Sequence, residues 1–356
     1  MLVRDFDFEL PPELIAQEPS AARTDARLLY LPREDGPPVH ATVAALPTLL
    51  REGDLVVVNN TRVFPARLLG RRVPGGGAVE CLLVRRLEEQ DPDDPGERWE
   101  ALMHPGQKLR PGGRVVFEGA ATLHGEVLQR RFFGRREIRL WTGDGSSVAE
   151  VVDRIGHMPL PPYIRRADRP ADRERYQTVF AESLGSIAAP TAGLHFNDVL
   201  LAALRERGVA MAEITLHVGY GTFQPVRVER VEDHHIEPER FDVSDRTARA
   251  VNRALDEGRR VVAVGTTTTR TLEAVAAAHG GRLVAGGGTT GLFIYPGFEF
   301  KVVRGLLTNF HLPQSSLLML VSAFAGRERV LDAYRTAVAN RYRFYSYGDA
   351  MLILGA

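Results

Sequence analysis

Three histidines of this chain stand beside tight turns, where their side chains could exchange protons with a ligand. His195 ends the segment "GSIAAPTAGLH", His217 precedes a "GYG" turn, and His311 follows Asn309 in "TNFHLP". Imidazole titrates near neutral pH, so it is the side chain best suited to general acid–base chemistry. No two of the three have the i, i+4 spacing of helical metal ligands, so we expect no metal site. For any one of them alone, a histidine that only satisfies a local hydrogen bond is the simpler alternative.

Hydroxyl-bearing residues accompany these histidines. Ser186 and Thr191 lie in the same segment as His195, and the run Thr266–Thr269 follows the apolar segment "VVAVG" and precedes Arg270. A strand that turns into a helix in this way offers free backbone N–H groups and hydroxyls to an anionic or ribose-like ligand. A well-capped turn without a ligand explains the threonine run equally well. The glycine patterns of the Walker loop and of the dinucleotide-binding turn are both absent.

An arginine-rich segment, "IRRADRPADRERYQTVF" (164–180), is the candidate for phosphate contacts. Arginine is well suited to hold phosphate oxygens. The acidic residues Asp168, Asp172 and Glu174 cancel much of the charge, so a solvated loop is the default interpretation unless the substrate is a nucleic acid. The arginines concerned are Arg165, Arg166, Arg169, Arg173 and Arg175.

The elements that must position these residues fall into two kinds. Six short runs between residues 63 and 143 have strand character and are separated by Gly, Pro and Asp turns, which predicts a small β-barrel. On either side, apolar strands such as "DLVVVNN" and "RRVVAVG" alternate with amphipathic helices, which predicts α/β layers. We therefore expect a discontinuous α/β domain, residues 1–62 and 150–356, with a barrel inserted at 63–149. A last strand is expected within residues 341–354.

The composition indicates where in the cell the protein works but does not identify a binding partner. The 356 residues include 45 basic and 45 acidic side chains, so the net charge does not point to a nucleic acid. A single cysteine, Cys81, excludes a disulfide framework and a cysteine-based zinc site. The first residues have no apolar signal segment, and the longest apolar run, "SSLLMLVSAFAG", is too short to cross a bilayer. We expect a cytoplasmic protein without a membrane partner.

Long motifs spread over almost the whole chain resemble those of the S-adenosylmethionine:tRNA ribosyltransferase-isomerases of queuosine biosynthesis. One departure is "DHHIEPERF", where Glu237 stands in place of a histidine that the family more often has, while His234 and Glu239 match. The matching segments are "LIAQEPSAARTDARLL", "GDLVVVNNTRVFPARL", "HMPLPPYI", "YQTVFAESLGSIAAPTAGLHF", "HVGYGTFQPV", "VGTTTTRTLE", "GLFIYPGFEFKVVRGLLTNFHLPQSSLLMLVSAFAG" and "YRFYSYGDAMLI".

The resemblance implies a reaction in which S-adenosylmethionine donates its ribosyl group rather than its methyl group. The acceptor would be 7-aminomethyl-7-deazaguanine at the wobble position of a tRNA, and the products epoxyqueuosine-tRNA, adenine and methionine. It likewise implies an α/β domain that carries a barrel, a monomer, and no cofactor beyond S-adenosylmethionine as co-substrate. A methyltransferase acting on tRNA and a non-catalytic RNA-binding protein are the alternatives from other classes.

This chemistry assigns roles to the residues above. His195 and His217 are the leading acid–base candidates, with His311 third. Ser186, Thr191 and Asn309 would hold ribose hydroxyls or adenine, and Thr266, Thr267, Thr268 and Thr269 the methionine carboxylate or the ribose. Arg270 would pair with a carboxylate or a tRNA phosphate. Glu213, Tyr220 and Phe223 are the candidates to face the sulfonium, and the arginines of residues 165–175 to contact the tRNA.

Overall fold

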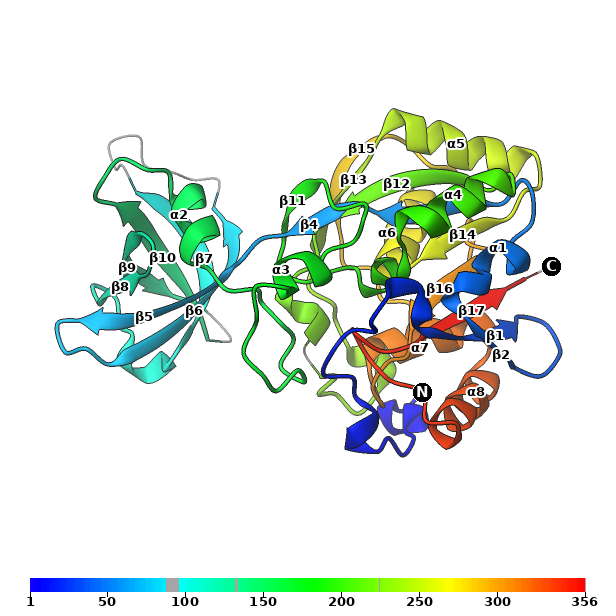
Figure 1. The fold of residues 1–356 in the computed structure, drawn as a ribbon, viewed down its shortest axis with the longest axis horizontal. Coiled ribbons are helices and arrows are strands. Elements are labelled where there is room, and N and C mark those ends of the chain that lie inside the picture. Colours follow the sequence, from blue (N-terminus) through cyan, green and yellow to red (C-terminus); the bar gives the residue numbers. More distant parts are fainter. Residues whose placement is uncertain (88–95, 132–133, 224, 356) are drawn as a thin grey trace.

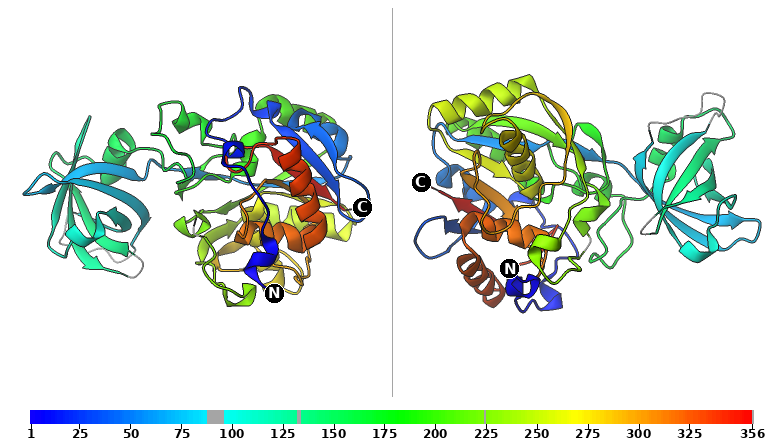
Figure 2. Two further views of the ribbon diagram at one scale, coloured as in Figure 1. Left: turned by 90° about the horizontal axis from the view of Figure 1, so that it is seen from below. Right: turned by 180° about the vertical axis from the view of Figure 1, so that it is seen from behind.

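The chain forms two lobes, a barrel and a larger α/β body, set side by side along the long axis of the molecule (Figure 1). The computed structural model describes residues 1–87, 96–131, 134–223 and 225–355, without the side chains of residues 222 and 223. The barrel stands apart at one end in every view (Figures 1 and 2). The chain enters it after β4 (Thr61–Val63), which pairs with β11 (Ser183–Ser186) in the body.

The smaller lobe is a closed barrel of six antiparallel strands, in the order β10-β7-β6-β5-β8-β9. Alternate side chains point inward, among them Cys81, Leu83 and Phe117, and form a core of their own. All six predicted strands are confirmed. Their bounds are β5 (Arg67–Val73), β6 (Ala78–Arg86), β7 (Glu97–His104), β8 (Arg114–Glu118), β9 (Thr122–Arg130) and β10 (Arg135–Thr142).

The helix that follows the barrel belongs to it. In α2 (Val148–Ile155), Val148, Val151 and Val152 are buried in the barrel core. Ser147 caps this helix and Glu150 completes the capping box, so the helix begins where the last strand has ended. The apolar face of α2 covers the barrel, so residues up to about 155 pack with that lobe, on the far side of the expected domain boundary at 149/150, which stays a prediction.

The body is built on a nine-stranded mixed sheet, ordered β15-β13-β12-β3-β14-β16-β17-β1-β2. Its centre consists of four parallel strands, β12, β3, β14 and β16. β17 runs antiparallel to β16 and parallel to β1. The bounds are β1 (Arg27–Pro32), β2 (Val39–Thr42), β3 (Leu55–Asn59), β12 (Ala210–Leu216), β13 (Glu239–Val243), β14 (Val261–Val264), β15 (Gly286–Thr290), β16 (Gly305–Asn309) and β17 (Ala350–Leu354).

Both faces of the sheet are covered, as the apolar strands require. In β3, Leu55 and Val57 contact the core beneath α5 (Asp245–Asp256) and α6 (Thr266–Ala278). Val56 and Val58 contact the opposite core, beneath α4 (Asp198–Glu206). The remaining α-helices are α1 (Leu46–Leu49), α3 (Asp172–Arg175), α7 (Ser316–Ala325) and α8 (Arg327–Ala339). No helix among the described residues is long and apolar enough to span a membrane.

The end of the chain is less regular than the sequence predicts. Only residues 350–354 of the expected strand 341–354 are in the sheet. Before them the backbone turns twice through positive φ, at Arg341 (+53°) and Tyr345 (+74°). Asp349 stabilises this turn by accepting hydrogen bonds from the backbone N–H groups of Arg27 and Arg343. The alternating aromatic residues thus form a loop instead of a strand.

Candidate active site

The carboxyl ends of the four central parallel strands meet at one edge of the sheet. A crevice at this edge is the usual ligand site of an open α/β sheet. Asn59, at the end of β3, connects the ends of two neighbouring strands by hydrogen bonds. Its Nδ2 donates to the carbonyl of Leu216 (3.0 Å), and its Oδ1 accepts from the N–H groups of Leu216 and Thr61. His217, Gly265 and the segment after Asn309 therefore emerge close to one another.

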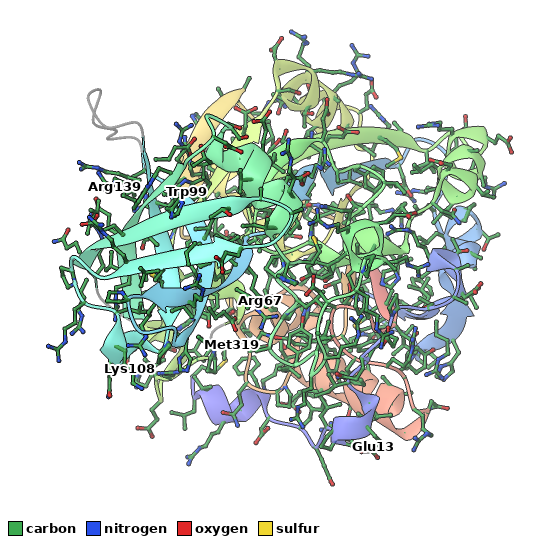
Figure 3. All side chains as sticks on the ribbon, turned by 60° about the vertical axis from the view of Figure 1, so that its left-hand side comes forward. Glu13, Arg67, Trp99, Lys108, Arg139 and Met319 are labelled. Carbon is green, nitrogen blue, oxygen red and sulfur yellow. The ribbon has the colours of Figure 1, made fainter. Side chains whose placement is uncertain are left out.

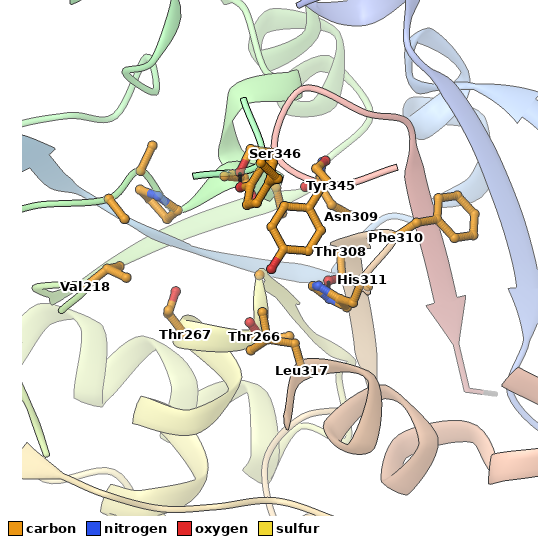
Figure 4. Close-up of a pocket in the computed structure, with 17 residues that line it drawn as sticks. Val218, Thr266, Thr267, Thr308, Asn309, Phe310, His311, Leu317, Tyr345 and Ser346 are labelled. Carbon is orange, nitrogen blue, oxygen red and sulfur yellow. Dashed lines mark hydrogen bonds between the residues drawn. The ribbon is translucent and has the colours of Figure 1, made fainter. Parts of the chain in front are cut away.

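A pocket opens at this edge (Figure 4). Four chain segments converge on it: 188–192, 265–267, 308–311 and 345–346. Its walls combine hydroxyl, amide and phenol groups with small apolar side chains, and none of the lining residues is Asp, Glu, Lys or Arg. Such a surface suits a neutral, hydrogen-bonding ligand such as a nucleoside. The lining polar residues are Tyr163, Thr191, Thr266, Thr267, Thr308, Asn309, His311, Tyr345 and Ser346.

Helix α6 presents its amino end to this pocket. It begins directly after β14, and its N-cap is Gly265, whose φ of +91° favours glycine and whose missing side chain caps no N–H group. The N–H groups of the first turn are therefore available to an anion. Among the predicted threonines, Thr266 and Thr267 line the pocket. Thr268 and Thr269 are fully buried and donate to the carbonyls of Val264 and Gly265, so they do not face a ligand.

His311 is the predicted acid–base residue that lines the pocket. Its Nε2 lies 2.8 Å from Oγ1 of Thr308, and its backbone N–H donates to the hydroxyl of Tyr334. Burial lowers the pKa of His311 to about 3. The imidazole is therefore neutral at physiological pH and can accept a proton only from a group brought into contact with it.

His195 lies at the end of a 3-10 helix (Thr191–His195), next to the end of β16, and is 5% exposed. Burial is the main cause that lowers its pKa to about 4, with Asp349 opposing the shift and Arg343 and Arg23 adding to it. Its Nε2 is buried, as is the Oδ1 of Asn309, and a hydrogen bond with the Asn309 side chain opposes the fall in the pKa of His195. The two side chains therefore meet beside the pocket, which Asn309 lines.

His217 directly follows β12 and does not line the pocket. Its Nδ1 lies 2.8 Å from Oγ1 of Thr61, and burial, with a smaller effect of Arg240, lowers its pKa. Gly185 makes room for the ring, because a Cβ at that position would lie 2.8 Å from Cε1 of His217. The structure thus brings all three predicted histidines to one sheet edge, with His311 in the pocket, His195 behind it and His217 to one side.

Two predicted ligand residues are engaged in the fold itself. Ser186 Oγ donates to the carbonyl of Ala188 (2.9 Å) and accepts from the N–H of Val218 (2.7 Å), which joins the two loops. Arg270 forms a buried ion pair with Glu239 at 2.6 Å. Its Nε also donates to the carbonyl of Leu292. Both side chains shape the site from behind. Of the two partners expected for Arg270, a carboxylate or a tRNA phosphate, the structure shows a carboxylate, that of Glu239.

The residues expected to face a sulfonium are not in the pocket. Glu213 is exposed on β12 and its carboxylate accepts from the amide of Asn60 (3.4 Å). Tyr220 lines a separate cleft near the barrel. The side chain of Phe223 falls outside the part of the chain that the structure describes. Glu237, which replaces a family histidine, pairs with Arg135 of the barrel.

The arginines of residues 165–175 are mostly committed within the protein. Arg166 forms ion pairs with Asp172 and Glu18, and Glu18 also binds Arg169. Arg173 donates to the carbonyls of residues 153 and 156, and Arg175 to those of residues 20 and 21. Arg165 is exposed and makes no ion pair among the described residues.

Sequence patterns missed part of the pocket wall. Tyr163 and Tyr345 pack edge to face with ring centroids 3.7 Å apart, and the hydroxyl of Tyr163 is hydrogen-bonded to Ser346. These residues lie in "PPYI" and "YRFYSYGD", which are part of the family resemblance but have no pattern of their own that indicates a ligand. Proximity in the fold, and not spacing in the sequence, brings them together.

The fold and the pocket define an α/β enzyme with an inserted barrel, whose site lies at the carboxyl edge of its parallel strands. The chain belongs to the queuosine biosynthesis protein family, whose model matches residues 3–353. The family predicted from the motifs is thereby confirmed, and so is the prediction of an enzyme.

Relatives of similar length support this assignment. Proteins of Geobacter metallireducens (52% identity) and Desulfitobacterium hafniense (49%) are named S-adenosylmethionine:tRNA ribosyltransferase-isomerase, and each alignment covers 99% of this chain and 100% of the relative. A crystal structure of the S-adenosylmethionine tRNA ribosyltransferase of Thermotoga maritima is 39% identical, with a TM-score of 0.54. It matches 98% of this chain and 100% of its own.

Proposed function

We propose that this chain transfers and isomerises the ribosyl group of S-adenosylmethionine onto 7-aminomethyl-7-deazaguanine at the tRNA wobble position. The products are epoxyqueuosine-tRNA, adenine and methionine. The observation that carries the proposal is the pocket itself. It combines hydroxyl, amide and phenol groups with small apolar ones, no charged side chain lines it, and it opens onto the amino end of α6. Asn309 in its wall is hydrogen-bonded to the buried His195.

The pocket offers a matching group for each part of S-adenosylmethionine. The methionine carboxylate binds the free N–H groups at the start of α6. Hydroxyls of Thr191 and Thr267 and the amide of Asn309 are within the lining and bind the ribose or adenine. The phenol ring of Tyr345 offers a π-face to the sulfonium cation. This assignment replaces Glu213 and Tyr220, which lie elsewhere.

The histidines supply the proton transfers. The sulfonium acidifies the ribose C5′, and a neutral imidazole accepts the proton that leaves this carbon. His195 and His311 are both neutral at physiological pH, because burial lowers their pKa values to about 4 and 3. Loss of this proton breaks the C4′–O4′ bond, and adenine departs with a proton as O4′ becomes the carbonyl oxygen of C1′. The substrate amine, after losing its own proton, adds to C4′, and the C5′ carbanion that results closes the carbocycle onto C1′. The alkoxide formed on C1′ then displaces methionine from C5′ and closes the epoxide. His217, beside the pocket, is the further base for the amine.

The proposed setting is the cytoplasm, with tRNA and S-adenosylmethionine as the two substrates and no additional cofactor. We propose that the protein acts as a monomer, as the family resemblance implies. Light scattering of the protein with and without tRNA tests this, and a stable dimer would contradict it.

The decisive experiment compares S-adenosylmethionine labelled in the ribose with S-adenosylmethionine labelled in the methyl group. With tRNA that carries the aminomethyl base, ribose label should enter the tRNA while adenine and methionine are released in equal amounts. Methyl label in the tRNA, with S-adenosylhomocysteine as product, would establish a methyltransferase instead. Binding of tRNA without any product would establish an RNA-binding protein.

The histidine assignment has its own test. The double variant His195→Ala/His217→Ala should lose adenine release by about 10²-fold or more, as expected when general bases are removed. Wild-type release by this variant would contradict the roles given to both residues.

A further inference from the structure

A second cavity lies where the barrel meets the α/β body. It is an open cleft of about 720 Å³, within the range that holds a nucleotide-sized ligand. Leu69, Leu82 and Leu102 of the barrel form one wall, and residues 159–162 with Tyr220 form the other. Arg67, at the start of β5, lies at this junction between the lobes (Figure 3).

The cleft shares a wall with the catalytic pocket. Tyr163 lines the pocket and its neighbour Ile164 lines the cleft. In the same way Ala188 faces the pocket and Ile187 faces the cleft. Two stretches of chain, each one residue thick, therefore separate the cavities. A polynucleotide with one base in the pocket would have its neighbouring nucleotide at the cleft.

Among the described residues, the charged groups of the cleft leave Arg165 without an ion-pair partner. Arg67 pairs with Glu80 at 2.8 Å. His157 Nδ1 lies 2.9 Å from Asp168, whose other oxygen accepts from the N–H of Met158. Arg166 is held by Asp172, as described above, so Arg165 is the arginine that remains for an external anion. Apart from these groups and His104, the lining side chains are mostly apolar, which suits the face of an unpaired base.

We propose that this interdomain cleft binds the unpaired anticodon-loop nucleotide next to the one being modified. Its base packs against the leucines, prolines and Tyr220, and Arg165 pairs with the phosphate that joins it to the wobble nucleotide. The barrel thereby acts as one jaw of an RNA clamp, and its role is to hold the loop open so that the wobble base reaches the pocket. This inference rests on the proposed function.

The test uses two cleft variants and a control matched to each. Leu69→Glu places a negative charge in the cleft at a side chain that is 44% exposed, and Val39→Glu makes the same change on β2, where Val39 is 48% exposed. Arg165→Ala removes the proposed phosphate contact, and Arg246→Ala removes an exposed arginine of α5. Both control positions lie in the body, on β2 and α5 (Figure 1), and neither residue lines the cleft.

The probe is an unmodified anticodon stem-loop RNA, whose dissociation constant is measured over a range of salt concentrations. Arg165→Ala should weaken binding about fivefold and reduce the slope of log K against log salt by about 0.7, the value for one contact to a single strand. Leu69→Glu should weaken binding by about tenfold or more, and both controls should bind as wild type does. Affinity for S-adenosylmethionine should be unchanged in all four variants.

Two results would overturn the inference. One is wild-type RNA affinity and salt slope in both cleft variants. The other is equal competition by a fully paired RNA duplex of the same length, because the cleft is proposed to hold an unpaired nucleotide. These measurements do not depend on catalysis. If wild-type protein bound the stem-loop through the cleft but transferred no ribose, the proposed function would fail while the cleft assignment stood.

Discussion

The buried ion pair between Arg270 and Glu239 allows a direct test of whether this arginine stabilises the fold or binds a ligand. The side chains are 3% and 5% exposed, and Glu239 also accepts a hydrogen bond from the N–H of Gly219 at 2.9 Å. Arg270→Met removes the guanidinium and leaves the carboxylate buried without its counter-charge. Breaking such a pair from one side costs about 3–5 kcal/mol.

That cost converts into a measurable shift in melting temperature. Unfolding entropy is about 2.1 cal/mol/K per residue, so for a domain the size of the α/β body the variant should melt about 5–8 °C below wild type. The assay is thermal unfolding followed by circular dichroism. Arg270→Met/Glu239→Gln should recover part of the loss, because a neutral amide can still accept from Gly219 and no unpaired charge remains. Arg246→Met, at an exposed position, should change the melting temperature by about 1 °C or less.

The opposite pattern would refute this reasoning. If Arg270→Met had the melting temperature of the wild type but bound tRNA more weakly and with a lower salt slope, Arg270 would pair with a tRNA phosphate and not with Glu239. The phosphate is the other partner that the sequence predicts for this arginine.

Three further predictions follow from individual contacts. Ser186→Ala should lower the free energy of unfolding by about 1–3 kcal/mol, measured by urea titration, because the buried N–H of Val218 loses its acceptor. An unchanged midpoint of the urea transition would contradict the role of the Ser186 hydroxyl in joining the two loops. Stability should fall as the pH drops from about 6.5, since His311 has a folded pKa of about 3 and the unfolded chain then binds the additional proton. His311→Gln should therefore reduce the slope of stability against pH by up to about 1.4 kcal/mol per unit between pH 6 and 4, and an identical slope would show that His311 is not buried. Gly185→Ala should lower the rate of ribosyl transfer into the tRNA with little change in the affinity for S-adenosylmethionine, because its Cβ displaces the ring of His217, the proposed base for the substrate amine; a wild-type rate of transfer would separate His217 from catalysis.

The barrel and the central sheet could be predicted because their signals are local. Each barrel strand is bounded by turn residues and alternates in polarity, and the buried strands are continuous apolar runs that end at polar residues. Strand pairing then follows from packing. The lobe on which α2 packs could not be predicted, because a helix shows its apolar face in the sequence but not which core that face covers. The apolar side of α2 fits either lobe by composition alone.

The site could be predicted only in part, for a related reason. His311, Asn309, Thr191, Thr266 and Thr267 lie beside strand ends, and parallel strands bring their ends to one edge, so these residues were found. Arg270 was assigned to a ligand because its burial depends on Glu239, which is 31 residues away in the sequence.

The aromatic wall was missed for a different reason, although its residues lie in recognised motifs. Tyr163 and Tyr345 pack edge to face although they lie 182 residues apart in the sequence. An alternating aromatic pattern such as "YRFYSY" favours a strand. The positive φ of Tyr345, which turns this segment into a loop, is fixed by tertiary hydrogen bonds such as that from its N–H to the carbonyl of Phe310.

The central claim is that S-adenosylmethionine binds in the pocket at the carboxyl edge of the parallel strands. A crystal structure of the protein with bound S-adenosylmethionine tests this most directly. We predict that the methionine carboxylate contacts the first N–H groups of α6 and that a polar group of the adenosine contacts Asn309 or His195. S-adenosylmethionine bound only in the interdomain cleft, with the pocket at Asn309 left without it, would contradict the account.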